Sequence, residues 1–260
     1  MTRAEILLEA IKRMPAGKVF GYSDLSDTGL KHNAMVIEMN RLVQRGEVAR
    51  VLRGRFVASN GHKDVVSAPD IIHAVCHYRN KVCGYETGPS VWEKWGLIPA
   101  MKKRKEFYVS IVQMRPAQQH GNIIIRFKRT RLDPARYNHE IMQFLDALES
   151  INTISLQTKT NVLQHLENRF LSWNESYRTQ LPVYALAYRP VARALAGSIL
   201  QNNGYTVEAR RLAASLHPAS TYIVKTDCSH LRNTTEWRII SQKETGRSIK
   251  KVTTSKLKSK

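Results

Sequence analysis

The 260-residue sequence is poor in the features that define several protein classes. It has three cysteines, Cys76, Cys83 and Cys228, and this small odd number argues against a disulfide scaffold. No apolar run reaches the roughly 18 residues that a membrane-spanning helix needs. Glu5 and Glu9 interrupt the first apolar stretch, so we expect neither a signal peptide nor a membrane partner. These features favour the reducing cytoplasm as the location.

Acidic residues are also scarce. The chain has 21 Asp and Glu against 41 Lys and Arg, which gives a net charge of +20. Such an excess favours a polyanionic partner, above all nucleic acid. The stretch from Arg247 onward is basic throughout and has few apolar residues, so residues 227–260 are predicted to be a flexible basic tail. This tail either binds phosphates non-specifically or only keeps the chain soluble.

Common catalytic and metal-binding signatures are missing as well. The sequence has no P-loop, GxGxxG turn, HExxH or CxxC motif. His73, Cys76 and His77 have helical spacing, but no second cluster completes a tetrahedral metal site. Cys228 lies two residues before His230, and adjacency along the chain is not catalytic geometry. A buried helix face and surface imidazoles are the simpler interpretation of both groups.

Carboxylates that could hold magnesium for a nuclease do not cluster either. Asp133, Glu140 and Asp146 are the closest set, and a spacing of six places the last two on different faces of a helix. The run Trp92-Glu93-Lys94-Trp95 lacks the intervening residue of a nuclease Glu-Lys pair. Its tryptophans are expected in the core, although base stacking stays open. We therefore predict no catalytic residue, no metal and no cofactor, and a protein that is not an enzyme.

What the sequence does contain is an N-terminal pattern of short helices. Thr2 and Glu5 fit a capping box at the start of a first amphipathic helix that ends near Pro15. Ser23 can cap a brief second helix, which Gly29 closes. The hydrophobic fraction of the chain is 42%, enough for these elements to pack on a core.

A third helix is predicted from about Lys31 to Gln44, with an apolar face that includes Met39 and Leu42. Two short strands, Glu47–Leu52 and Arg55–Ser59, follow it and form a ribbon. Three helices followed by a two-strand ribbon are typical of a winged helix-turn-helix. In that fold the third helix enters the major groove and the ribbon lies near the DNA backbone or the minor groove.

The residues expected to contact DNA are those on the outer face of the third helix and on the ribbon. They are Lys31, His32, Asn33, Val36, Asn40, Arg41, Arg45, Arg50, Arg53 and Arg55. Among them, Asn40, Lys31 and His32 are the strongest candidates for base or phosphate contacts. Two other interpretations stay open: winged helices also bind proteins, and a basic helix face is often only solvated.

Beyond a linker near 62–64, the sequence predicts a mixture of strands and helices. A helix capped by Ser67 runs to about Arg79, two strands span Phe107–Val112 and Asn122–Phe127, and 84–90 is a turn-rich loop. Basic residues cluster at 102–105 and at 126–131. Helical patterns follow at 137–151, 160–173, 190–203 and 207–216. The predicted fold class is therefore α+β, with domains at 1–63 and 64–226 and a tail at 227–260.

Several stretches resemble a known family. The segment Arg45-Gly46-Glu47 followed by 50–56 (RVLRGRF), the segments 87–89 (TGP) and 95–99 (WGLIP), and the late run from 188 to 197 (YRPVARALAG) are similar to AbiE-type, type IV antitoxins. The similarity is spread over residues 1–225, without a single diagnostic signature. Lys94 departs from the family pattern, and the basic tail has no counterpart in it.

The resemblance implies a two-part protein of an abortive-infection, or phage-defence, system. Its winged helix would bind inverted repeats in its own promoter as a monomer or dimer and repress transcription. Its antitoxin-like C-terminal domain, mixed α/β and then helical, would counteract a cognate nucleotidyltransferase-like toxin, with or without direct contact. The alternative from charge alone is a non-specific basic protein that binds DNA or RNA and has no antitoxin role.

Overall fold

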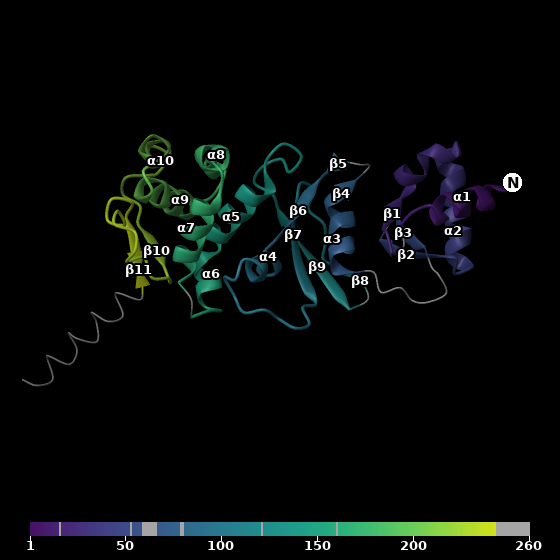
Figure 1. Ribbon diagram of the computed structural model, residues 1–260, viewed down its shortest axis with the longest axis horizontal. Coiled ribbons are helices and arrows are strands. Elements are labelled where there is room, and N and C mark those ends of the chain that lie inside the picture. Colours follow the sequence, from purple (N-terminus) through teal and green to yellow (C-terminus); the bar gives the residue numbers. More distant parts are fainter. Residues whose placement is uncertain are drawn as a thin grey trace, which may run out of the picture. The chain divides into compact units, whose positions relative to one another are not determined.

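The computed structural model describes residues 1–15, 17–52, 54–58, 67–78, 81–120, 122–159 and 161–242. The fold is mixed α/β and divides into two compact units (Figure 1). Unit 1 comprises Met1–Glu86 and Lys105–Thr130, and unit 2 comprises Thr87–Arg104 and Arg131–Lys260. Each unit is therefore discontinuous in sequence, which a boundary search along the chain does not detect. The predicted linker at 62–64 and the tail from 243 onward lie outside the described residues.

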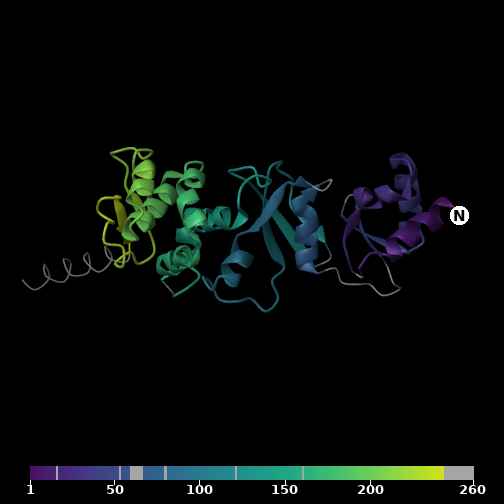
Figure 2. The same ribbon diagram turned by 45° about the horizontal axis from the view of Figure 1, so that its top comes forward.

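The N-terminal segment of unit 1 has helices on one side of a small sheet (Figure 2). In chain order its elements are α1 (Arg3–Lys12), β1 (Phe20–Gly21), η1 (Tyr22–Thr28), α2 (His32–Gln44), β2 (Val48–Leu52) and β3 (Arg55–Ala58). The strands are antiparallel in the order β1-β3-β2. The predicted third helix and ribbon are thus present within one or two residues of their expected bounds.

Capping explains where these helices begin. The predicted box of α1 is present, because the Thr2 side chain accepts from the Glu5 amide and the Glu5 carboxylate accepts from the Thr2 amide. The prediction that Ser23 caps the second helix is wrong. Instead, the Gly21 amide donates to the Asp24 carboxylate at 2.7 Å, because pairing of β1 with β3 ends at Gly21 and the 3-10 helix starts one residue later.

The core of this segment lies between the helices and the sheet. Met39 and Leu42 of α2 are fully buried, as their spacing predicts, and they belong to one cluster with Leu7 of α1 and Phe56 of β3. This packing fixes the opposite face of α2 toward solvent. The orientation of the candidate site therefore follows from the apolar spacing of a single helix.

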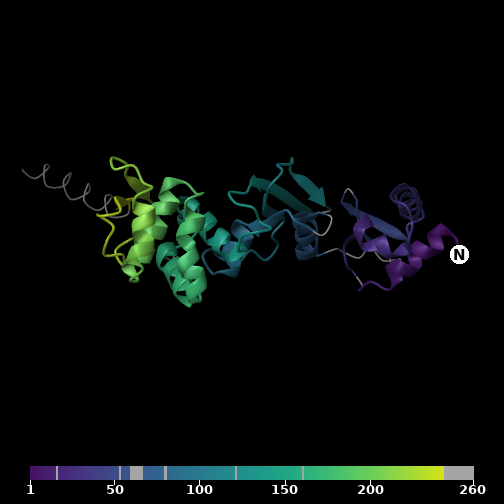
Figure 3. The same cartoon turned by 90° about the horizontal axis from the view of Figure 1, so that it is seen from above.

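The rest of unit 1 is a helix on a four-stranded sheet (Figures 1 and 3). Its elements are α3 (Ala68–Cys76), β4 (His77–Tyr78), β5 (Lys81–Val82), β6 (Gly84–Thr87), β7 (Glu106–Ile111), β8 (Gln118–His120) and β9 (Ile123–Arg129). The sheet order is β6-β7-β9-β8, with β7 parallel to β9. The predicted helix to Arg79 ends at Cys76, where the β4–β5 hairpin begins. The predicted loop at 84–90 contains β6, in which only a glycine fits at 84 because a Cβ would lie 2.6 Å from the Ser110 carbonyl oxygen.

Unit 2 is mainly helical, with a two-stranded parallel sheet. Its elements are α4 (Pro89–Lys94), α5 (His139–Glu149), α6 (Ile151–Ser155), α7 (Val162–Ser172), α8 (Glu175–Ala185), α9 (Pro190–Asn202), α10 (Thr206–Ala213), β10 (Tyr222–Val224) and β11 (Ile239–Ser241). The sequence pattern did not predict α8, whose interior contains Pro182. None of the described helices has the length and apolar character to cross a membrane.

The predicted tail and the structure differ between Asp227 and Ser241. Cys228, Leu231 and Trp237 are buried in this stretch, and the Trp237 indole donates to the Gln201 side chain at 2.7 Å. The indole packs against Gly197 of α9 so closely that a Cβ there would lie 2.0 Å from the ring. A count of charges does not predict this packing, because a few buried apolar side chains, here Ile239 as well, are enough to fold a polar stretch onto a helical core.

Candidate nucleic-acid interface

A groove of about 810 Å³ opens between α2, η1 and the β2–β3 hairpin. Its lining comprises Gly21, Tyr22, Ser23, His32, Val36, Asn40, Arg50, Gly54, Arg55 and Tyr78. Five of these residues were predicted from the sequence to contact DNA: His32, Val36, Asn40, Arg50 and Arg55. The fold thus brings half of the predicted set into one concave surface.

On the groove side of α2, His32, Val36 and Asn40 follow one another at intervals of four residues and so form one stripe. The His32 ring meets the Tyr22 ring edge-on at 5.1 Å between centroids. Lys31 and Asn33 are exposed at the start of the same helix, outside the groove lining. The N-cap residue Lys31 makes no side-chain capping bond, which leaves the first α2 amides to other partners.

Arg50 reaches the stripe from β2. One of its Nη2 hydrogens is donated to Oδ1 of Asn40, and its guanidinium carbon lies 5.5 Å from the centroid of the Phe56 ring. The Tyr22 ring also meets Phe56, at 5.4 Å. Burial raises the pKa of Tyr22, while the Arg50 charge lowers it to a smaller extent, so the phenol stays a proton donor at neutral pH.

The other described arginines of the predicted set have carboxylate partners. Arg41 pairs with Glu38 at 2.8 Å, Arg45 with Glu47 at 2.5 Å and Arg55 with Asp24 at 3.8 Å. Arg55 also donates to the His77 carbonyl oxygen at 2.6 Å, so its guanidinium is engaged although it lines the groove. Arg53 lies outside the described residues. Among the described arginines of the predicted set, Arg50 is therefore the one that donates a hydrogen bond to a neutral side-chain amide.

The lining residues outside the predicted set are Gly21, Tyr22, Ser23, Gly54 and Tyr78. Tyr22 and Ser23 fall at the junction of β1 and η1, where no periodicity guides a prediction. The one available signal was an aromatic residue two positions after Phe20, the residue that pairs with Phe56 across the sheet. Tyr78 comes from β4, which lies 24 residues beyond Gly54 along the chain.

Three arginines of the other predicted basic clusters have carboxylate partners. Arg104 pairs with Glu93 at 2.8 Å, Arg131 with Glu149 at 3.0 Å, and Arg126 with Glu106. The hydrogen bond from Arg104 is the main reason that the pKa of Glu93 lies below its usual value. Glu93 is thus committed to an ion pair, which argues against a nuclease-like role for it.

The three carboxylates that were considered as magnesium ligands each interact with different partners. Asp146 is buried and accepts the Thr87 hydroxyl at 2.7 Å, and Glu140 accepts from Arg169 and the Trp173 indole. Asp133 pairs with Arg136 (3.4 Å). Among the residues that the structure describes, no group of three His, Cys, Asp or Glu side chains is placed to hold a metal ion.

The predicted histidine–cysteine group lies on the last turn of α3 and at the start of β4. The rings of His73 and His77 stack at 4.1 Å, and Nδ1 of His77 hydrogen bonds the His73 carbonyl oxygen at 2.8 Å. Cys76 is buried, and burial raises the pKa of its thiol to about 12. A thiol with that pKa is protonated at neutral pH and is a poor nucleophile.

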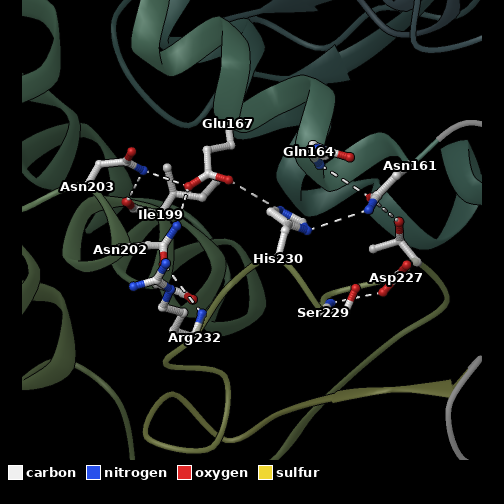
Figure 4. Close-up of polar contacts among 12 residues, drawn as sticks. Asn161, Gln164, Glu167, Ile199, Asn202, Asn203, Asp227, Ser229, His230 and Arg232 are labelled. Atoms are coloured by element: carbon white, nitrogen blue, oxygen red, sulfur yellow. Dashed lines mark hydrogen bonds and ion pairs between the residues drawn. The ribbon is translucent and has the colours of Figure 1, made fainter.

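A second polar cluster lies in unit 2, around Glu167 of α7 (Figure 4). One Glu167 oxygen accepts from the side-chain amides of Asn202 and Asn203, each at 2.7 Å, and the other lies 3.4 Å from Nε2 of His230. Burial lowers the pKa of His230, whereas Glu167 and Asp227 act in the opposite direction. The cluster fastens the 227–233 loop to α7 and α9, so its polar groups serve the packing of unit 2.

Comparison with known proteins does not identify a family for this chain. No family model and no curated protein matches the chain. A solved structure, titled as the crystal structure of the RV2827C protein from Mycobacterium tuberculosis, aligns with 92% of this chain and 91% of that chain. The alignment has 10% sequence identity and a TM-score of 0.48.

Proposed function

We propose that this chain is a DNA-binding autorepressor whose N-terminal segment is a winged helix. The element order α1-β1-η1-α2-β2-β3 and the sheet order β1-β3-β2 support this, with α2 as the recognition helix and β2–β3 as the wing. The observation that supports it most is the groove beside α2, which combines Asn40 and Arg50. A net charge of +20 supplies the phosphate attraction that any DNA complex needs.

We further propose that the chain is the antitoxin of an AbiE-like system in the bacterial cytoplasm, and that unit 2 counteracts a nucleotidyltransferase-like toxin. This half of the proposal rests on the resemblance of the sequence to that family. Co-expression tests it: a toxic neighbouring gene product should lose its effect on growth when this chain is present. If growth arrest persisted with full-length chain at equal or higher abundance, the antitoxin half would be wrong.

The DNA half is tested by titrating the protein with the duplex upstream of its own gene and with a scrambled duplex, at about 150 mM salt. A repressor should bind the upstream duplex at least roughly 1,000-fold more tightly, and the complex should survive excess bulk DNA. Equal affinities would favour the second candidate, a non-specific nucleic-acid binder, for which the high net charge is the specific argument.

A further inference from the structure

Asn40 and Arg50 form a pair across two elements of the groove. Asn40 belongs to the exposed face of α2, and Arg50 to the exposed side of β2. Arg50 donates to Oδ1 of Asn40, and its guanidinium carbon lies 5.5 Å from the centroid of the Phe56 ring. The long side chain is therefore held before any ligand arrives, which lowers the entropy lost on binding.

Arg50 also differs from the other described arginines of the predicted set in the kind of partner that its charge has. Arg41, Arg45 and Arg55 face carboxylates, whereas the hydrogen-bond acceptor of Arg50 in the described chain is a neutral amide. A guanidinium has five N–H donors, and the bond to Asn40 uses one of them. The remaining donors of a positively charged, oriented group line an open groove.

Although Arg50 belongs to the ribbon, its guanidinium lies at Asn40 of α2, the helix expected to enter the major groove. The ligand that matches such a group there is guanine. In the major groove, guanine presents two acceptors, N7 and O6, which arginine contacts with two parallel hydrogen bonds. Adenine combines an acceptor with a donor, and cytosine offers a donor, so neither is complementary to a guanidinium alone. We infer that Arg50 contacts a guanine of the target site and that Asn40 is the positioning residue that aims it. This inference rests on the proposed function, DNA binding through α2 and the hairpin.

The experiment uses the full-length protein and duplexes enriched from a randomised library at about 150 mM salt. Each guanine of the enriched sequence is then replaced by 7-deazaguanine, which removes the N7 acceptor and keeps base pairing. At one position, the replacement should weaken binding of the unmodified protein roughly 10-fold. The same replacement should weaken binding by Arg50→Ala or Asn40→Ala less than about 2-fold, because these variants no longer make the contact.

Two further variants serve as controls. Arg41→Ala removes the adjacent arginine of α2, which pairs with Glu38 and does not line the groove, so it should keep the full 7-deazaguanine effect. Asn40→Asp keeps an acceptor for Arg50 but turns its partner into a carboxylate, so it should bind all DNA more weakly and show a smaller 7-deazaguanine effect at the same guanine. A thermal melt of each variant verifies that the chain is folded.

The outcomes separate the two proposals. Enriched duplexes that are indifferent to 7-deazaguanine at every position overturn the inference and leave sequence-specific DNA binding intact. Retention of the full effect by Arg50→Ala overturns the inference in the same way. A library from which no sequence is enriched contradicts the proposed repressor function itself, and the guanine contact with it.

Discussion

Arg178 of unit 2 and Arg50 of unit 1 have different kinds of partner. Arg178 of unit 2 donates to the carbonyl oxygens of Phe170 and Leu171 at the end of α7, and to the Tyr205 hydroxyl at 3.1 Å. Arg50 of unit 1 has an exposed guanidinium held by one amide beside a groove. Arg178 thus donates to carbonyl oxygens at the end of a helix, whereas Arg50 is exposed to solvent. The partners of a charge, and not the net charge, therefore distinguish these two arginines.

The largest expected effect concerns the packing of the 227–241 segment against α9 in unit 2. Gly197→Ala places a methyl group 2.0 Å from the Trp237 ring, so the indole must move out of its site. We expect a loss of about 3 kcal/mol in the free energy of unfolding, measured by urea denaturation. In a Trp237→Ala background the same substitution should cost far less. Equal losses in both backgrounds would show that the 227–241 segment does not pack on α9 as described.

Next in size is the structural arginine. Arg178→Met keeps the aliphatic stem but removes the guanidinium that donates to the carbonyl oxygens of Phe170 and Leu171, of which the Phe170 oxygen keeps the Trp173 amide. The free energy of unfolding should fall by about 2 kcal/mol, since hydrogen bonds to a charged group are among the stronger ones. Affinity for the upstream duplex should stay the same in the folded protein. A clear loss of DNA affinity would break the contrast between the two units.

The opposite pattern is expected for the groove. Arg50→Met should leave the free energy of unfolding within about 0.5 kcal/mol, as is usual for an exposed side chain. Its affinity for the upstream duplex should fall roughly 10-fold, from the lost contacts. Fluorescence anisotropy and a thermal melt on the same sample measure both quantities. A large drop in melting temperature with unchanged affinity would move Arg50 to the structural class.

The smallest effect is a pH dependence in unit 2. Burial lowers the pKa of His230 in the folded chain, so the unfolded chain takes up a proton more readily below its usual pKa of 6.5. Stability is therefore present above pH 6.5 and is lost as the pH falls below it. His230→Gln should reduce the difference in unfolding free energy between pH 7.5 and 5.5, by less than about 1 kcal/mol. An unchanged or larger difference would contradict the buried, neutral imidazole.

The local sequence predicts which elements line the groove, but it does not predict the hydrogen bonds and ion pairs between their side chains. The apolar spacing of Met39 and Leu42 was enough to place α2 and to expose Asn40. The bond between Asn40 and Arg50 depends on the path of the hairpin, because ten residues separate the two along the chain. Likewise, a count of charges does not predict the ion pair between Arg55 and Asp24.

The C-terminal region shows the same limit. Helical periodicity predicted α9, but nothing in the sequence around Trp237 indicates that its ring lies against Gly197. Long-range pairs of this kind are set by tertiary packing, which the period of a segment does not encode. The parallel pairing of β7 with β9 is another such case.

Hydrogen exchange of the full-length protein, with and without the upstream duplex, tests most directly whether DNA binds at the groove beside α2, as we propose. We expect slower exchange confined to α2, the start of η1 and the β2–β3 hairpin, with α7, α9 and α10 unchanged. Protection at 102–105, 126–131 or unit 2, with α2 unaffected, would contradict it.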